Sequence, residues 1–314
     1  MLGYVFKRLL LTLPTLLLVS VGVFLLIRLI PGDPALVLLG QDADAASLAS
    51  VRAELGLDRS VPVQFVTWLG HAVQGDLGRS IVTGEPVSTL ILGHFGLTAA
   101  VVLVAVALAT LIAITAGLVA AWRQNSAIDL AVVGAATVVL AVPSFWLGLL
   151  LLLLFGVKLG WLPFVGYIPF SQSAVQAVLF LVMPVVTLTI TESGVLTRMM
   201  RASSIDVLQL DYVTHARAKG LSEAAVLIRH VFPNAFAPTL TLVGLTLGHL
   251  LGGVAVIETV FTLPGLGRLM VDSVLSRDYP VVQGCLLFTA VVYVVVNLIV
   301  DLCYPIFDPR VTAR

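Results

Sequence analysis

The sequence predicts an all-α polytopic membrane protein. Its 314 residues are 59% hydrophobic and only 11% charged, and a mean hydropathy of +1.10 is too high for a soluble domain of this length. Apolar runs of about 18 or more residues are long enough to cross a bilayer as helices, and they are too long for transmembrane strands. Six such runs occur, at residues 9–30, 96–121, 128–155, 176–197, 235–257 and 283–300.

These runs divide the chain into three parts. Residues 1–30 form a first transmembrane helix, which we expect to be retained because no small-residue cleavage pattern follows it. Residues 31–95 form an external segment. Residues 96–314 form a core of five transmembrane helices with a cytoplasmic loop at about 198–234.

The positive charges predict the orientation of these spans. When the N terminus is placed inside, the Lys and Arg residues near span ends gather mostly on that side, whereas acidic side chains outnumber arginines in 31–95. An even number of spans places both termini on one side. We therefore expect a bacterial cytoplasmic (inner) membrane protein with cytoplasmic termini, a lipid bilayer around it and no nucleic-acid partner.

The external segment begins where PGDP, at residues 31–34, ends the first helix, since two prolines and a glycine cannot continue it. Two short amphipathic helices are predicted over 46–57 and 63–74. The second follows Pro62 and stops at Gly75. Both are expected to lie on the membrane or on other external surfaces.

The fifth run contains three glycines at every fourth position, which line one helix face and allow another helix to approach closely. They are Gly244, Gly248 and Gly252. Spacing alone leaves open whether the neighbouring helix belongs to this chain or to a second membrane subunit.

The cytoplasmic loop contains a polar, basic stretch, DYVTHARAKGLSEAAVLIRHVFPNA, at residues 211–235. A first helix is predicted over 211–219, with basic residues in its last turn and Gly220 at the stop. Ser222 is the predicted N-cap of a second helix, and Pro233 marks the return to the membrane. A helix, a glycine bend and a second helix with apolar side chains among the charges suggest a docking site for a soluble partner. A basic loop that only sets topology is the simpler alternative.

This stretch resembles the cytoplasmic EAA loop of ABC importer permeases, in their peptide/nickel branch. Other motifs fit the same branch: PGDP, AVQGDLGRS near Gly75, GWLP after the third run, and FTLPGLGRLMVDSVLSRDYPVVQG between the fifth and sixth runs. Permeases for di- and oligopeptides, including the glutathione importer type, are the nearest likeness. The resemblance implies a six-helix type I ABC importer transmembrane domain that forms half of a pathway for small peptides. Import of nickel or another small solute by the same machinery stays open.

The resemblance also implies that the loop inserts a coupling helix into a groove of an ATPase subunit. Tyr212 and Leu221 are the expected apolar anchors. This chain has Thr214-His215-Ala216 where the generic loop has Glu-Ala-Ala, which leaves the individual ATPase contacts open. The implied coupling residues are Tyr212, Thr214, His215, Ala216, Arg217, Lys219, Gly220, Leu221 and Pro233.

The expected partners are a second, homologous permease, two ATP-binding subunits and an extracytoplasmic substrate-binding protein. The chain has no phosphate-binding loop of its own, since none of its three lysines follows a glycine. We therefore expect it not to be an enzyme by itself and to bind no cofactor, with ATP and Mg on the partner ATPase subunits.

Ionisable residues in or beside the last four runs are candidates for the pathway or the outer gate. The segment around 265–280 either faces the binding protein and shapes the gate or is a salt-bridged loop that caps helix ends. The candidates are Glu192, Glu258, Arg268, Asp272, Arg277, Asp278 and Tyr279.

Three other functions have weaker support. A secondary transporter needs intramembrane ionisable groups, and Glu192 and His249 stand isolated without repeat symmetry; His249 is expected to be a hydrogen-bonded core residue. Ser193 with His249 only faintly resembles an intramembrane serine protease dyad. The five histidines lack metal-ligand spacing, so no metal site is expected.

Cys285 and Cys303 lie about 27 Å apart along one helix and cannot form a disulfide with each other.

Overall fold

The computed structural model describes residues 2–29, 45–54, 58–164 and 166–307. These ranges are helical apart from turns and one isolated bridge between Arg79 and Pro86. The PGDP motif and the end of the predicted helix over 46–57 lie outside them. The elements are α1 (Leu2–Leu29), α3 (Ala45–Glu54), α4 (Val61–Val73), α5 (Val87–Trp122), α6 (Ala127–Ala141), α7 (Ser144–Leu151), η1 (Leu152–Lys158), α8 (Ala174–Leu208), α9 (Asp211–Ala218), α10 (Glu223–Val226), η2 (Leu227–Val231), α11 (Phe232–Leu251), α12 (Ala255–Val260), α13 (Leu266–Leu275) and α14 (Tyr279–Phe307).

Four helices in the described ranges are long and apolar enough to cross a membrane: α5, α8, the continuous stretch from α10 through α11, and α14. The bent pair formed by α6 and α7–η1 is a possible fifth span, and α1 carries a shorter apolar stretch, Leu10–Leu26. The predicted class, an all-α polytopic membrane protein, is confirmed.

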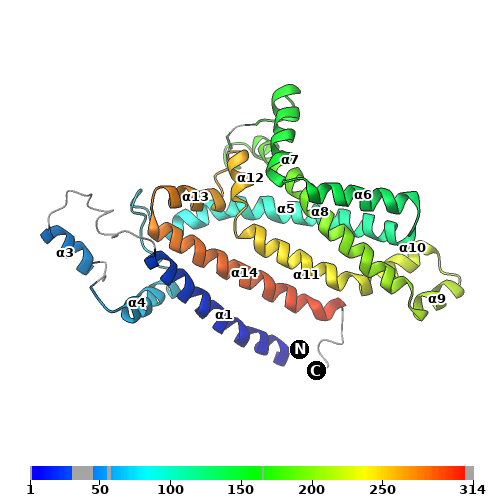
Figure 1. Cartoon of the computed structure of the whole chain (residues 1–314), viewed down its shortest axis with the longest axis horizontal. Coiled ribbons are helices and arrows are strands. Elements are labelled where there is room, and N and C mark those ends of the chain that lie inside the picture. The colour runs from blue at the N-terminus through cyan, green and yellow to red at the C-terminus, as the bar shows by residue number, and fades with distance from the viewer. Residues whose placement is uncertain (1, 30–44, 55–57, 165, 308–314) are drawn as a thin grey trace.

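The third and fifth apolar runs do not form the straight spans that were predicted. The run at 128–155 is broken after Ala141, and its two halves are bent by 97°. Pro143 explains the break, because it lacks an N–H donor and confines Val142 to an extended backbone. Figure 1 shows α7 standing away from the bundle. The fifth run was expected to end at 257, but its helix already ends at Leu251.

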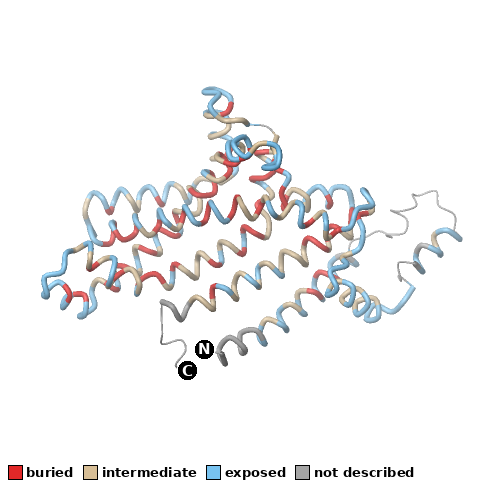
Figure 2. The backbone as a smooth tube through the Cα atoms, turned by 180° about the vertical axis from the view of Figure 1, so that it is seen from behind, coloured by how far each residue is buried: buried red, intermediate tan, exposed pale blue. Residues whose placement is uncertain are grey.

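Helices α5 and α8 pack against each other, α11 contacts α8 and α14, and α1 lies against α14 (Figure 1). Small residues bring the central helices close together. A Cβ at Gly117 would lie 2.8 Å from Met200, and one at Gly194 would lie 3.1 Å from the carbonyl oxygen of Ala136. Figure 2 shows the buried residues following the shared faces of these helices, with much of the outer surface exposed.

The glycine face of α11 is covered by α14 of the same chain. A Cβ at Gly244 would lie 2.5 Å from Val300, and one at Gly248 would lie 2.6 Å from the ring of Tyr293. At Gly252 the nearest atom belongs to Thr289, at 2.9 Å. This intramolecular packing leaves no room on the face for a helix of another subunit.

Helix α4, in the segment predicted to be external, is held to α1 by aromatic side chains. Phe24 of α1 packs edge-to-face on Phe65, and both rings contact Trp68. The guanidinium of Arg28 lies over the Phe24 ring and donates to Gln64 Oε1. This contact explains why α4 lies against the first helix and does not form a separate domain.

Candidate functional site

The predicted cytoplasmic loop forms one short helix, α9, which meets at a glycine the first turn of the long helical stretch that continues through α10, η2 and α11. Helix α9 covers Asp211–Ala218, one residue less than predicted, and Gly220 follows with φ +81°. No atom lies within 4 Å of where a Cβ at Gly220 would be. The bend therefore requires glycine for its backbone conformation and not for space.

Polar contacts stabilise the second half of this bend. The Ser222 hydroxyl accepts a hydrogen bond from the Ala225 N–H at 3.4 Å, as the N-cap prediction requires. The Arg217 guanidinium reaches across the bend to Glu223, with Nε 2.9 Å from Oε1 and a second nitrogen 3.1 Å from Oε2. α9 and α10 are thus tied together in one geometry.

The inner face of α9 is buried against the ends of the long helices. Val213 and Ala216 are its buried residues, one turn apart. Ala216, which was among the expected ATPase contacts, therefore faces this core and not the surface. The cluster that covers it joins α5, α8, α10, η2 and α11 through Leu118, Met200, Val207, Val226, Val231 and Phe236. A displacement of α9 would consequently be passed to these helices.

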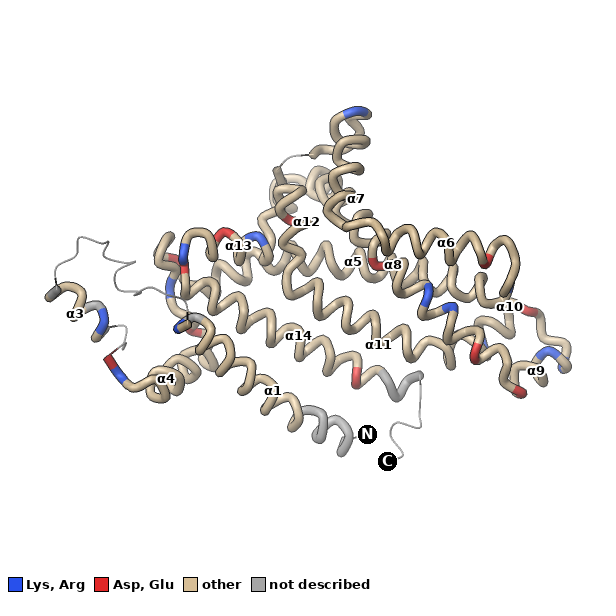
Figure 3. Tube along the Cα trace, in the orientation of Figure 1, with Lys and Arg blue, Asp and Glu red and all other residues tan. Residues whose placement is uncertain are grey.

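The outer face of α9 is exposed. Tyr212 and Leu221, the expected anchors, are 40% and 36% exposed, and the other expected contacts except Ala216 and Pro233 are exposed too. Partial burial raises the pKa of the Tyr212 phenol, so it stays a neutral donor; its hydroxyl lies 3.4 Å from the His230 carbonyl oxygen. Figure 3 shows Lys or Arg and Asp or Glu positions on this end of the molecule.

Two further apolar residues extend this exposed surface and were not predicted. Leu210 precedes α9, and Ile228 in η2 is 65% exposed. In the sequence each stands next to a charged residue, Asp211 or Arg229, and this apolar position in a polar stretch is the signal that could have identified them. Together with Tyr212 and Leu221 they make the loop surface partly apolar, as a docking site needs.

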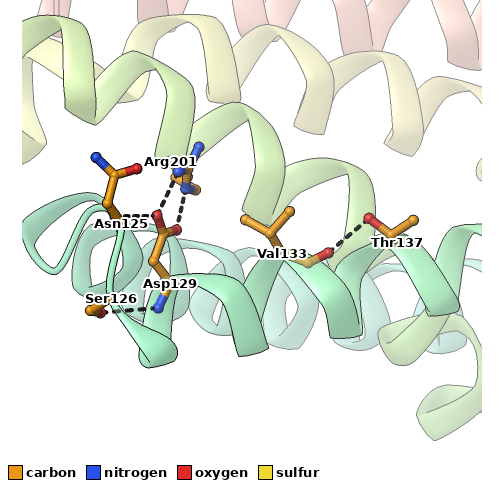
Figure 4. A network of polar contacts seen from close by, with 6 residues as sticks. All are labelled: Asn125, Ser126, Asp129, Val133, Thr137 and Arg201. Atoms are coloured by element: carbon orange, nitrogen blue, oxygen red, sulfur yellow. Dashed lines mark hydrogen bonds and ion pairs between the residues drawn. The ribbon is translucent and has the colours of Figure 1, made fainter.

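A buried ion pair beside this loop was also missed. Arg201 of α8 binds Asp129 of α6 through two hydrogen bonds, of 2.5 and 2.7 Å (Figure 4). The Asn125 N–H donates to the same carboxylate at 2.9 Å. No spacing in the sequence points to this pair, because Asp129 lies 72 residues from Arg201 and belongs to an apolar run. The pair joins the short turn after α5 to α8, which leads into α9.

At the opposite end of the bundle, no continuous helix joins α11 to α14. The helical backbone is interrupted at a level that the neighbouring helices still cover. Gly252, at the end of α11, faces Thr289, which lies about 15 Å along α14 from its first residue, Tyr279. Helices α12 and α13 fill the remaining distance. We call residues 252–278 the gate segment. Non-helical backbone at such a depth needs hydrogen-bond partners from the protein.

The Glu258 carboxylate supplies these partners. It is 2% exposed, accepts from the Arg268 N–H at 2.8 Å and from the Thr98 hydroxyl at 2.5 Å. Thr98 in turn accepts from the Leu266 N–H at 2.8 Å. A Cβ at Gly265 would lie 2.1 Å from the carboxylate, which explains the glycine. Glu258, a gate candidate by sequence, thus holds the first turn of α13 in place.

The other gate candidates do not form one cluster. Arg268 and Asp272 make an i,i+4 pair at 3.7 Å on the exposed side of α13. Asp278 is buried and accepts hydrogen bonds from the Ser80 hydroxyl and, at 3.1 Å, from the Ile81 N–H. Asp278 therefore attaches the external segment to the gate segment. Arg277 has φ +58° between this carboxylate and Tyr279, the first residue of α14.

Glu192 lies half-buried in the middle of α8, and His249 is exposed on α11. The prediction of a hydrogen-bonded core histidine is wrong: across the described ranges no hydrogen bond engages the His249 ring. No group of three potential metal ligands occurs in these ranges either.

Two family models match the chain. One, for a binding-protein-dependent transport system inner membrane component, matches residues 113–313, and the model for the N-terminal part of such membrane components matches residues 1–102. A protein of Brucella suis biovar 1, provisionally named a peptide transport system permease, is 42% identical over 99% of both chains.

The glutathione transport system permease protein GsiC of Pectobacterium atrosepticum is 43% identical over 99% of both chains. Among solved structures, the MetNI methionine ABC transporter in inward-facing conformations matches with a TM-score of 0.52 at 18% identity, over 69% of this chain and 97% of that one. This last similarity shows the fold alone.

Proposed function

The chain belongs to the family of inner membrane components of binding-protein-dependent transport systems, and from this premise we propose that it forms half of the pathway of an ATP-driven peptide importer. A second, related permease forms the other half. Two ATPase subunits bind ATP and Mg on the cytoplasmic side, and an external binding protein delivers substrate. Both termini lie in the cytoplasm, and the membrane is the bacterial inner membrane.

The two-faced geometry of α9 carries this proposal. Its inner face, Val213 and Ala216, is embedded in the cluster that joins α5, α8 and α11. Its outer face is exposed and mixes apolar Tyr212 and Leu221 with charges. An element that is exposed for a partner and rigidly attached to the spans can convert movement of that partner into movement of the pathway.

The peptide substrate is supported by the names of the relatives. The proteins from Brucella and Pectobacterium are named for peptide and glutathione transport and match essentially the whole chain. A separate binding protein would select among peptides, so the substrate range belongs to the assembled importer.

Cysteine crosslinking tests the coupling role. His215→Cys or Leu221→Cys, introduced separately, should form a disulfide with a cysteine in the groove of the ATPase subunit when the importer is assembled in membranes. Val274→Cys, on an exposed position of α13 at the opposite end, is the matched control and should not crosslink. The proposal fails if neither loop cysteine crosslinks in any nucleotide state.

A further inference from the structure

The membrane-spanning helices expose two chemically different faces. The outward face of α5 is aliphatic, as expected for contact with lipid tails, and its exposed large residues include Leu103, Val104, Leu108, Leu111 and Ile112. Helices α8 and α11, which pack against each other, also expose the aliphatic residues Val195 and Leu245, but close to them in sequence are the half-buried Glu192 and the exposed His249.

Glu192 lies in the middle of α8. Its neighbours Thr191 and Ser193 donate their hydroxyls to carbonyl oxygens of their own helix, those of Thr187 and Ile190. Within the part of the chain that the structure describes, no hydrogen bond or ion pair engages the Glu192 carboxylate. His249 lies on α11, the helix that packs against α8.

An unpaired ionisable group in a membrane helix is costly unless it faces water or a counter-charge. The face of α8 and α11 therefore cannot be a lipid face like that of α5. This face is aliphatic except for polar residues near the middle of the span. In an importer subunit, this composition suits the wall of the transport pathway.

We propose that Glu192 and His249 form a polar station in the pathway, where the Glu192 carboxylate binds the terminal ammonium group of the passing peptide. This inference rests on the proposed function. A carboxylate and an ammonium group form a charge-assisted hydrogen bond, which would orient the peptide by its amino end. His249, on the neighbouring helix α11, can donate a hydrogen bond to the peptide. A station of this kind must bind weakly enough to release what it binds.

Accessibility of a nearby cysteine tests the station in the assembled importer, reconstituted in proteoliposomes. Val195→Cys, about one turn from Glu192, is introduced after Cys285 and Cys303 have been replaced by alanine. A charged, water-soluble thiol reagent should label it, and tri-alanine should protect it. Leu111→Cys on the α5 face is the matched control and should stay unlabelled.

The charge requirement is then measured with N-acetyl-tri-alanine, which lacks the ammonium group. Protection should need about ten-fold more of the acetylated peptide, because that peptide cannot form the hydrogen bond between charged groups. Glu192→Gln should abolish this difference, whereas Glu192→Asp should keep it. Asp206→Asn, which removes an exposed acid near the end of α8, should change nothing.

Two results would overturn the inference while uptake of tri-alanine remains normal. Val195→Cys could resist labelling, because the face lies in lipid or is covered by a basic side chain of the second permease. Alternatively, both peptides could protect equally with Glu192 in place. A wild-type importer that takes up no peptide at all would instead refute the proposed function.

Discussion

The loop formed by α9 and α10 and the gate segment contain the same elements but place their charged side chains differently. Each joins two helices at a glycine and has a glutamate close to the bend. In the loop, Glu223 and Arg217 lie at the surface, and the free space around Gly220 leaves the outer side open. In the gate segment, Glu258 is turned inward onto the first turn of α13, and Gly265 is needed to admit it. Charge therefore lies at the surface at one end and holds the protein's own backbone at the other.

Removal of the Glu258 carboxylate should produce the largest effect. Glu258→Ala leaves the Arg268 N–H and the Thr98 hydroxyl buried without their acceptor, which should lower the free energy of unfolding by about 3 kcal/mol or more. Glu258→Gln retains one acceptor oxygen and should lose less. Denaturant unfolding of the detergent-solubilised protein measures both. Equal stability of Glu258→Ala and wild type would mean that the carboxylate does not hold α13.

The bend in the loop should respond to backbone conformation and not to bulk. Gly220→Val places a β-branched residue at φ +81° and should destabilise this conformation by about 1–2 kcal/mol, with normal membrane insertion but strongly reduced transport. Gly220→Asn, which tolerates positive φ, should restore most of the transport. The measurement is the ratio of ATP hydrolysed to substrate taken up. Normal transport by Gly220→Val would show that the bend transmits no force.

The loop was predictable because its signals are local. The basic last turn of α9, Gly220 and the Ser222 cap lie within a few residues of each other, and each predicted its element to within one residue. The contacts of Glu258 with Thr98 and of Asp129 with Arg201 join residues 160 and 72 positions apart. Separations this long lie outside any helix or turn spacing, so the sequence alone could not identify these contacts.

The break in the third apolar run was not predicted, because hydropathy does not report backbone conformation. Hydropathy measures composition, and the run at 128–155 is apolar on both sides of its break. The signal was Pro143, which restricts the residue before it and removes a donor. A rule that interrupts apolar runs at proline would still have misplaced spans, because Pro184 and Pro238 lie inside continuous helices.

Loss of the exposed ion pair in the loop should have the smallest effect. Arg217 and Glu223 are 37% and 39% exposed, so Glu223→Gln should change the free energy of unfolding by less than about 0.5 kcal/mol. Its effect on transport should also be small. The same denaturant titration provides the measurement. A loss as large as that of Glu258→Ala would remove the distinction between the two regions.

The Asp129–Arg201 pair has a consequence for how the chain is made. The ribosome adds about 5–20 residues per second, so the 72 residues between them separate the synthesis of the carboxylate from that of its counter-ion by roughly 4–14 seconds. During that interval α6 has been made and α8 has not. Asp129 lies in the first turn of α6, at the N-terminal end of the apolar run. There its carboxylate can stay hydrated until Arg201 has been made. The nascent chain can thus insert one helix before the next arrives to neutralise it.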